Sequence, residues 1–180
     1  YFRFYKKGEL LMFCYPAFDF LKEELKNSEY NYLEIGIFNG DSLAELAKIF
    51  PEKQFYGIDP FIEDGWTTHT TGVEYGEPMP TQKQNAIKNL EGLGNVGIYE
   101  MLSLDFAKYM NRLDTDFNVG YVLIDGSHHY KDVVVDIFIA MRLIGNKPGC
   151  IIFDDVNLEE VGTAFSQFKE IFNDRIISVE

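Results

Sequence analysis

The clearest chemical signal in the sequence is a set of acidic residues that follow two β-like runs. Asp125 comes directly after the apolar run at 119–124, and the pair Asp154 and Asp155 comes directly after the run at 150–153. If these runs are neighbouring parallel strands, three carboxylates converge at one edge of the sheet. Such carboxylates repel one another unless they share a cation or a proton, and oxygen ligands select hard ions such as Mg²⁺ or Ca²⁺. The spacing predicts a metal site, with helix capping by each aspartate as the alternative.

Two histidines lie in the segment that follows Asp125. His128 is three residues beyond Asp125, and His129 is its neighbour. The ordinary pKa of imidazole suits proton abstraction near neutral pH, so either ring is a candidate general base. A loop histidine is also often merely solvated, and the sequence leaves the choice between the two open.

A segment with two glycines, Glu34 to Gly40, joins a predicted strand to the helix that follows it. Glycines at such a place let the backbone approach a ligand and adopt turns that other residues avoid. A plain turn without a ligand would explain Gly36 and Gly40 equally well. The dinucleotide fingerprint requires three glycines, so an NAD-dependent oxidoreductase is disfavoured.

Two further polar residues follow predicted strands. Asp59 lies 19 positions beyond Gly40, at the end of the run 55–58, where an acid can accept hydrogen bonds from both ribose hydroxyls. Turn formation ahead of Pro60 is the alternative for Asp59. Ser103 precedes a predicted helix, so it could contact an adenine or act as a plain N-cap.

The elements that must position these groups alternate between short β-like runs and amphipathic helices, which is typical of an α/β fold with a parallel sheet. Residues 1–28 are expected to form a helical region, and residues 61–80 a long loop whose Trp66, His69 and Tyr75 could cover a substrate or only pack the loop down. The expected strands are 32–37, 55–58, 96–101, 119–124, 150–153 and 175–179, and the expected helices are 42–50, 81–92, 104–113, 130–144 and 157–172.

Length, charge and cysteine content limit the class of protein. The 180 residues suit one compact domain. The net charge of −13 repels phosphate backbones and anionic lipid, so nucleic acid and membrane surfaces are poor partners. No apolar run approaches the roughly 20 residues that span a bilayer. Cys14 and Cys150, both in apolar surroundings, are expected to be buried reduced thiols of a cytoplasmic protein.

The helix predicted at 130–144 carries apolar residues outside its main stripe. We assign the stripe to Val133, Val134, Ile137, Phe138, Met141 and Ile144. Val135 and Ile139 lie off this stripe. A second contact, such as a partner subunit, would use them, so the pattern would suit a homodimer.

Three segments together resemble the class I S-adenosylmethionine-dependent methyltransferases. They are 33–42, with Gly36, Gly40 and Ser42; 56–61, with Asp59; and 124–155, which contains Asp125-Gly126-Ser127-His128-His129-Tyr130, Asp136 and Asp154-Asp155. The third is the most specific and is similar to the pattern of small-molecule O-methyltransferases of the macrolide-sugar and antibiotic type. The resemblance covers about residues 30–160.

The resemblance implies a three-layer α/β/α Rossmann-like sheet with strand order 3-2-1-4-5-7-6. Because the chain ends in the sixth strand of that scheme, the seventh strand is expected to be missing. Residues 30–180 would form the S-adenosylmethionine-binding domain. Residues 1–29 would form a helical region that could cap the substrate.

The resemblance also implies roles for the residues at the strand ends. Glu34, Gly36, Gly40 and Ser42 would bind the amino-acid half of the methyl donor, Asp59 its ribose and Ser103 its adenine. Asp125, Asp154 and Asp155 would hold Mg²⁺, which in turn holds the acceptor hydroxyl. His128, with Asp125 beside it, is the expected catalytic base, although catechol-type relatives use a lysine at this place.

These observations favour a Mg²⁺-assisted O-methyltransferase that acts on a sugar or phenolic hydroxyl of a small molecule. One alternative keeps the donor without the metal. Another is a module that binds S-adenosylmethionine without catalysis. DNA methylation is disfavoured by the acidic charge and because Asp59-Pro60-Phe61 has one proline where the DNA-methylating motif has two.

Overall fold

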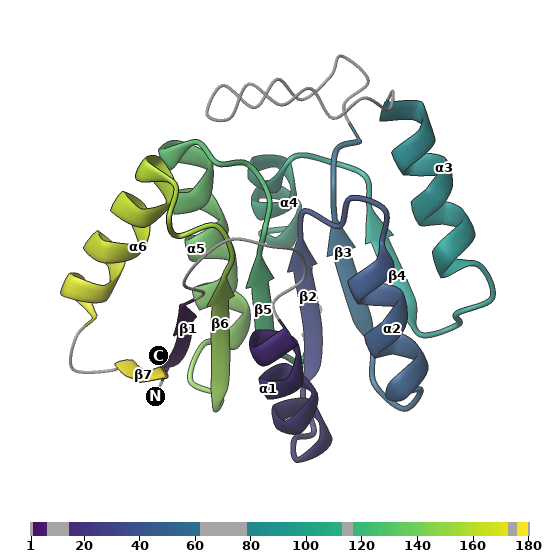
Figure 1. Cartoon of the computed structure of the whole chain (residues 1–180), viewed down its shortest axis with the longest axis horizontal. Helices are drawn as coiled ribbons and strands as arrows, with labels where there is room; N and C mark the ends of the chain where they lie inside the picture. Colours follow the sequence, from purple (N-terminus) through teal and green to yellow (C-terminus); the bar gives the residue numbers. More distant parts are fainter. Residues whose placement is uncertain (1, 7–14, 62–78, 113–116, 173–175, 180) are drawn as a thin grey trace.

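A computed structural model describes residues 2–6, 15–61, 79–112, 117–172 and 176–179. Its centre is a seven-stranded sheet with the order β4-β3-β2-β5-β6-β1-β7 (Figure 1). Every strand pairing in this sheet is parallel. The strands are β1 (Phe2–Lys6), β2 (Asn31–Ile35), β3 (Phe55–Ile58), β4 (Val96–Tyr99), β5 (Val119–Ile124), β6 (Gly149–Phe153) and β7 (Ile176–Val179). Strands 1 to 5 of the family scheme correspond to β2 to β6 of this structure. Their predicted order, 3-2-1-4-5, is confirmed as β4-β3-β2-β5-β6.

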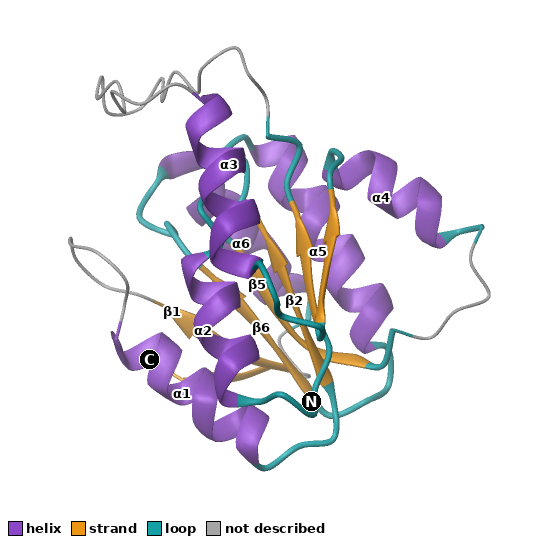
Figure 2. Cartoon of the chain, turned by 90° about the vertical axis from the view of Figure 1, so that its right-hand side faces the viewer, coloured by secondary structure: helices purple, strands orange, loops and turns teal. Residues whose placement is uncertain are grey.

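Helices cover both faces of the sheet, and Figure 2 shows α1, α2 and α3 on one side and α4 and α5 on the other. The helices are α1 (Tyr15–Lys26), α2 (Asp41–Ile49), α3 (Met79–Leu90), α4 (Ser103–Met110), α5 (Tyr130–Ile144) and α6 (Glu159–Ile171). Alternation along the strands supplies each face with its own core. Tyr32 and Tyr121 pack with α1 and α2, while their neighbours Leu33 and Val122 pack with α4, α5 and α6. The three-layer architecture is therefore confirmed.

The N-terminal segment differs from the expected helical region. Residues 2–6 form β1, and the helix α1 begins only at Tyr15. β1 lies between β6 and β7, with Phe2 opposite both Gly149 and Ile176. The place of the seventh strand, which we expected to be missing, is thus filled by a strand parallel to both of its neighbours. The alternation Phe2-Arg3-Phe4 is a strand signal that the sequence does contain.

Helix α5 corrects the apolar stripe assigned from the sequence. Phe138, placed on the inner face, is 67% exposed, whereas Ile139 is 1% exposed. Val135 is partly buried against the same core. Because α5 packs against β5, α4 and α6 at once, it buries a wider face than one stripe. Val135 and Ile139 therefore need no partner subunit to explain them, and the homodimer stays a prediction.

Several other expectations can be compared with this structure. Cys150 is fully buried in β6, as predicted. Cys14 and the segment with Trp66, His69 and Tyr75 lie outside the described residues. None of the helices described is both long enough and apolar enough to span a membrane.

Candidate active site

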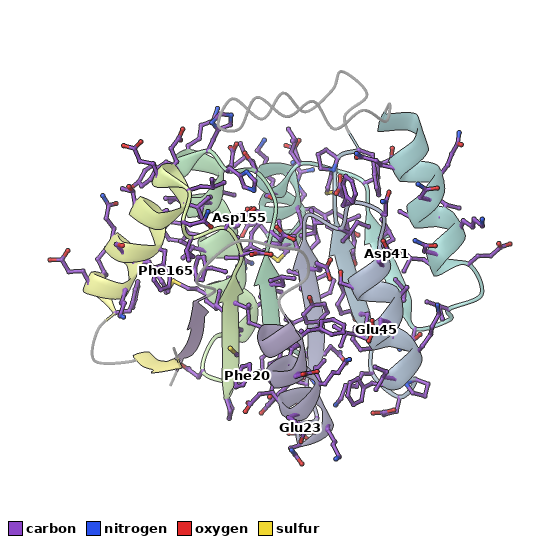
Figure 3. All side chains as sticks on the ribbon, viewed as in Figure 1. Phe20, Glu23, Asp41, Glu45, Asp155 and Phe165 are labelled. Carbon is purple, nitrogen blue, oxygen red and sulfur yellow. The ribbon has the colours of Figure 1, made fainter. Side chains whose placement is uncertain are left out.

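The residues singled out in the sequence follow the carboxyl ends of five strands, which lie along one edge of the sheet. In Figure 3, Asp155 lies at the end of β6 and Asp41 at the start of α2, both toward this edge. Among the described residues, three of the four non-glycine residues with positive φ also follow strands here, namely Phe38, Phe61 and Asp155. Strained backbone of this kind collects at functional sites. We therefore take this edge as the candidate site.

An aspartate from each of two neighbouring strands meets His128 at the edge. One potential ligand atom each from Asp125, His128 and Asp155 lies within 4.8 Å of the other two. His128 Nε2 is 3.0 Å from Asp155 Oδ2. The parallel pairing of β5 with β6, in which Ile124 lies opposite Phe153, brings the two aspartates together. The predicted convergence of Asp125 and Asp155 is thus present in the structure, with an imidazole as the third group.

Asp154, the third predicted metal ligand, lies outside this group in the described part of the chain. Its Oδ1 accepts a hydrogen bond from the backbone N–H of Asp155 at 2.8 Å. Asp155 has a φ of 53°, in the left-handed region that most residues avoid. The Asp154 carboxylate thus stabilises the turn that presents Asp155.

The two histidines have different surroundings. His129 Nδ1 lies 3.6 Å from Glu160, and both side chains are more than half exposed. Glu160 also accepts a hydrogen bond from the backbone N–H of Tyr130 at 2.7 Å, which caps the start of α5. His129 therefore belongs to the contact between α5 and α6. His128 is the histidine beside the aspartates.

The loop that carries His128 is held by side-chain hydrogen bonds. Ser127 Oγ donates to Asp132 Oδ2 at 2.8 Å and accepts from the backbone N–H of His129 at 3.3 Å. These bonds tie the loop to the first turn of α5. The position of His128 is therefore set before any ligand binds.

The two glycines leave room for other parts of the protein. A Cβ on Gly36 would lie 2.1 Å from the carbonyl oxygen of Asp125, and a Cβ on Gly40 would lie 3.2 Å from Leu90. Both glycines have positive φ, at 86° and 72°. Gly36 thus allows the loop after β2 to lie against the loop after β5, and Gly40 allows α3 to approach α2.

Glu34 and Ser42, both expected to bind the donor, contact each other. Glu34 is 2% exposed and accepts hydrogen bonds from Ser42 Oγ at 2.5 Å and from Tyr32 Oη at 3.0 Å. Burial raises the pKa of Glu34 to about 7, although both hydrogen bonds oppose this. The pair fastens the start of α2 to the end of β2.

Asp59 organises the loop in front of α2. Its Oδ2 accepts hydrogen bonds from the backbone N–H groups of Ile37 at 3.0 Å and Phe38 at 3.1 Å, and its Oδ1 accepts one from Phe61 at 2.8 Å. Partial burial raises its pKa, and these three bonds act in the opposite direction. Asp59 therefore links the ends of β2 and β3, with its side chain still partly exposed.

Ser103 is the first residue of α4, and Leu102 occupies the N-cap position. The simple N-cap alternative therefore does not describe this residue. Ser103 is partly exposed at the site edge. Its hydroxyl also lies near the Asp136 carboxyl and lowers the pKa of that group.

Asp136 is a site neighbour to which the sequence analysis gave no role. It is 1% exposed, and neither carboxyl oxygen has a hydrogen-bond partner among the described residues. Burial raises its pKa to about 7. The sequence does contain a signal, because an aspartate between Val133 and Ile137 interrupts the inner stripe of the helix.

A cavity of about 510 Å³ lies at the opposite edge of the sheet, lined by Tyr30, Phe117, Arg142, Lys147 and neighbouring residues that precede strands or end helices. It is therefore separate from the groups described above.

Comparison with known proteins identifies the family of this fold. The sequence profile of a family described as a methyltransferase domain matches residues 33–156. This range, which is most of the chain, contains every residue predicted for the site.

One curated relative is the uncharacterized protein R132 of Acanthamoeba polyphaga mimivirus. It is 31% identical over 137 residues, which are 75% of this chain and 55% of the relative. The chain thus spans about half the length of that viral protein.

Two solved structures share the fold. One is the apo structure of CalS11, a TDP-rhamnose 3'-O-methyltransferase of calicheamicin biosynthesis, with a TM-score of 0.59 at 14% sequence identity. The match covers 87% of this chain and 69% of the CalS11 chain. The other is a protein of Klebsiella pneumoniae named as a candidate O-methyltransferase, with a TM-score of 0.63 at 18% sequence identity. The match covers 90% of this chain and 70% of the Klebsiella protein. At these identities the likeness is one of fold.

Proposed function

Because the chain belongs to the methyltransferase domain family, we propose that it is an S-adenosylmethionine-dependent O-methyltransferase acting on a hydroxyl of a small molecule. The observation that carries this proposal is the pair formed by His128 and Asp155, 3.0 Å apart and next to Asp125. A histidine oriented by a carboxylate is a common means of removing a proton from a hydroxyl.

In the proposed reaction, the acceptor hydroxyl gives its proton to His128. Asp155 accepts the N–H of Nε2, which fixes the tautomer and makes Nδ1 the basic nitrogen. The acceptor oxygen attacks the methyl carbon, the O–C bond forms, and the S–C bond breaks with its electron pair left on sulfur. The products are the methyl ether, S-adenosylhomocysteine and a protonated imidazole, which returns its proton to water.

We further propose that the site takes a divalent cation. The carboxylates of Asp125 and Asp155 approach each other in the cluster with His128, where potential ligand atoms lie within 4.8 Å of one another. Carboxylate oxygens suit Mg²⁺ and Mn²⁺. Asp125 and Asp155 would hold the ion, which when bound supplies a Lewis acid that lowers the pKa of the acceptor hydroxyl, while His128 would remain the base.

A metal-independent methyltransferase is the second candidate function. It is favoured by the contact between His128 and Asp155, since a base that already has an orienting carboxylate needs no ion to act. Here Asp125 would accept a hydrogen bond from the acceptor. Turnover that survives complete removal of divalent ions would select this candidate over the first.

The proposed acceptor is a small sugar or phenol. The charge of −13 disfavours nucleic acid and anionic membrane as substrates. The fold likeness to a sugar methyltransferase makes nucleotide-linked sugars sensible first members of an acceptor panel.

The test is methyl transfer from labelled S-adenosylmethionine to a panel of sugars and phenols, with and without Mg²⁺ or Mn²⁺. We expect His128→Gln to lower kcat by about 100-fold or more, the usual contribution of a general base. The matched control is His129→Gln, which we expect to stay within about threefold of the wild type because His129 contacts Glu160 instead. Equal activity of the two variants would contradict the role of His128, and binding of the donor without transfer to any acceptor would contradict the enzyme.

A further inference from the structure

The cavity of about 510 Å³ at the amino ends of the strands takes no part in the proposed function. Tyr30 precedes β2, Phe117 precedes β5 and Pro148 precedes β6, and all three line it. In Figure 1 the arrows of these strands point away from this end of the sheet, toward the edge that carries the candidate active site. Pockets for small molecules commonly enclose about 300–1,000 Å³, so the cavity is large enough to hold one.

The charge of the cavity wall is opposite to that of the whole protein. The chain has 29 acidic and 16 basic residues. The wall nevertheless carries the cationic side chains of Arg142 and Lys147 and, among the described residues that line it, no carboxylate. In a protein whose overall field repels anions, such a wall is where a small anion would be attracted. The charge therefore favours an anionic ligand.

A neutral partner holds the guanidinium of Arg142 in place. Arg142 Nη1 donates a hydrogen bond to the Oδ1 of Asn111, the residue that follows α4. An amide orients the guanidinium but leaves its positive charge uncompensated, which a carboxylate partner would not do. The planar fork of N–H donors in arginine matches a carboxylate or a phosphate group. Asn111 therefore orients Arg142 and leaves its charge available to a ligand.

Hydrogen bonds and close packing fix the wall of the cavity around Tyr30 and Phe117. Asn31 donates from its Nδ2 to the carbonyl of Phe117 at 2.8 Å and from its backbone N–H to the carbonyl of Asn118 at 2.9 Å. A Cβ on Gly120 would lie 2.7 Å from the Cβ of Tyr30, so Tyr30 packs directly against β5. A wall that is already ordered lowers the entropy cost of binding.

Two features decide which anion suits this cavity. The carbonyl groups in the last turn of α5, where Arg142 lies, carry partial negative charge, and the protein as a whole carries a charge of −13. Both oppose a second negative charge on a ligand. Tyr30, Met110 and Phe117 give the wall an apolar part as well. An aromatic ring with one carboxylate group fits this combination better than a phosphate ester with two charges.

We propose that this cavity is a second ligand site, separate from the site of methyl transfer, which binds a small aromatic carboxylate through Arg142 and Lys147. The carboxylate would accept hydrogen bonds from the guanidinium of Arg142, and Lys147 would add a second positive charge. The ring would lie against Tyr30. This site does not depend on the proposed function, so a failure of one leaves the other unaffected.

The test compares three naphthalene compounds of similar shape on the full chain. They are 2-naphthoate, the neutral 2-naphthamide, and 2-naphthyl phosphate, which carries two negative charges at pH 8. Titrations followed by NMR of the nitrogen-15-labelled protein give each affinity and show which backbone amide signals move. We expect 2-naphthoate to bind at least about tenfold more tightly than 2-naphthamide, because charge-assisted hydrogen bonds exceed neutral ones, and more tightly than 2-naphthyl phosphate.

The amide signals locate the bound compound. Gly145 and Asn146 line the cavity, so their signals should shift when 2-naphthoate is added. Ser127 and His129 lie in the loop after β5, at the opposite edge of the sheet, so their signals should not shift.

Variants test the role of the arginine charge. The Arg142 side chain is exposed, so Arg142→Gln should keep the fold. We expect it to lower the affinity for 2-naphthoate about tenfold or more and to leave that for 2-naphthamide within about threefold. Arg112→Gln is the matched control. Arg112 is exposed next to Asn111 but is not one of the described cavity residues, so both affinities should stay within about threefold of the wild type.

The outcomes are distinct. Equal affinity for 2-naphthoate and 2-naphthamide, tighter binding of 2-naphthyl phosphate, or no binding of any of the three would overturn the aromatic carboxylate as the ligand. Shifts at Ser127 and His129 in place of Gly145 and Asn146 would overturn the second site. A lower free energy of unfolding in Arg142→Gln with an unchanged affinity for 2-naphthoate would show that the arginine only offsets the carbonyl groups of α5.

Discussion

The carbonyl oxygen of Asp125 occupies the space beside Gly36 in which a side chain would otherwise lie, at 2.1 Å from the position of a Cβ. This contact joins the loop after β2 to the loop that carries His128. The backbone N–H of Asp125 also donates to the carbonyl of Ile35 at 2.9 Å. The donor side and the catalytic side of the proposed site are therefore held together by backbone atoms.

Substitution of Gly36 tests this relationship. Gly36→Ala would push the Asp125 carbonyl away and adopt an unfavourable positive φ, so we expect a loss of about 3 kcal/mol or more in the free energy of unfolding. Gly40→Ala is the matched comparison, because Gly40 shares the positive φ but its Cβ would lie 3.2 Å from the Leu90 side chain and at an ordinary contact distance of 3.6 Å from the Ala86 Cα. This variant should lose about 1–2 kcal/mol in the free energy of unfolding. Urea denaturation measures both. Similar losses for the two variants would show that φ, and not the Asp125 contact, sets the cost.

Metal binding should depend on Asp125 and Asp155 more than on Asp154. Asp125→Asn and Asp155→Asn each remove a charged ligand from the cluster, so we expect Mn²⁺ affinity to fall about tenfold or more in either variant. Asp154→Asn keeps an oxygen that can accept from the Asp155 N–H, so its Mn²⁺ affinity should fall less. Electron paramagnetic resonance titration with Mn²⁺ reports the three affinities. A larger loss in Asp154→Asn than in Asp155→Asn would restore Asp154 as the ligand.

The stability of the protein should fall as the pH rises from about 4 to 7. Burial raises the pKa of Glu34 and of Asp136 to about 7, so the folded state binds protons that the unfolded state has released. Each tenfold difference between the acid dissociation constants of a group in the folded and unfolded states corresponds to about 1.4 kcal/mol in the free energy of unfolding. Asp136→Asn cannot ionise, and its stability relative to the wild type should therefore be greater at pH 8 than at pH 5 by about 2–3 kcal/mol. Urea denaturation at the two pH values measures this difference. The absence of a difference would show that the pKa of Asp136 in the folded protein is close to its ordinary value.

Asp59 should contribute to donor binding through the loop it holds. In Asp59→Asn, one oxygen remains to accept from three backbone N–H groups, so the loop at Ile37 and Phe38 loses a partner. We expect the KM for S-adenosylmethionine to rise about tenfold, with a smaller change in kcat, because the chemistry takes place at His128. Steady-state kinetics at saturating acceptor separates the two constants. A fall in kcat with an unchanged KM would contradict this role.

Much of the fold could be predicted because its signals are local. Alternating residues such as Tyr32 and Leu33 in β2 indicate a strand buried on both faces, and the stripe through Val133 and Ile137 indicates the helix that follows β5. Once the strands are taken as parallel, their carboxyl ends share an edge, so Asp125 and Asp155 were expected to meet. β1 was missed because its place between β6 and β7 depends on pairing with residues more than 140 positions away in the chain.

The details of the site depend on distances that no sequence pattern encodes. His128 and His129 are neighbours of the same type, and the Ser127 and Asp132 hydrogen bond helps to direct them to different partners. The same holds for the neighbours Asp154 and Asp155, because the positive φ of Asp155 turns the chain between their side chains.

Composition and periodicity thus account for the alternation of strands and helices and for the edge at which the acids gather, whereas the three layers and the strand order of the core were implied by the resemblance to the methyltransferase family. Three features arise only when segments distant in the chain pack together. They are the choice of which histidine faces the acids, the filled space beside Gly36 and the burial of Asp136. The reason is physical. Hydrophobic periodicity acts over a few residues, whereas hydrogen-bond partners and buried charges are set by the three-dimensional neighbours that folding supplies.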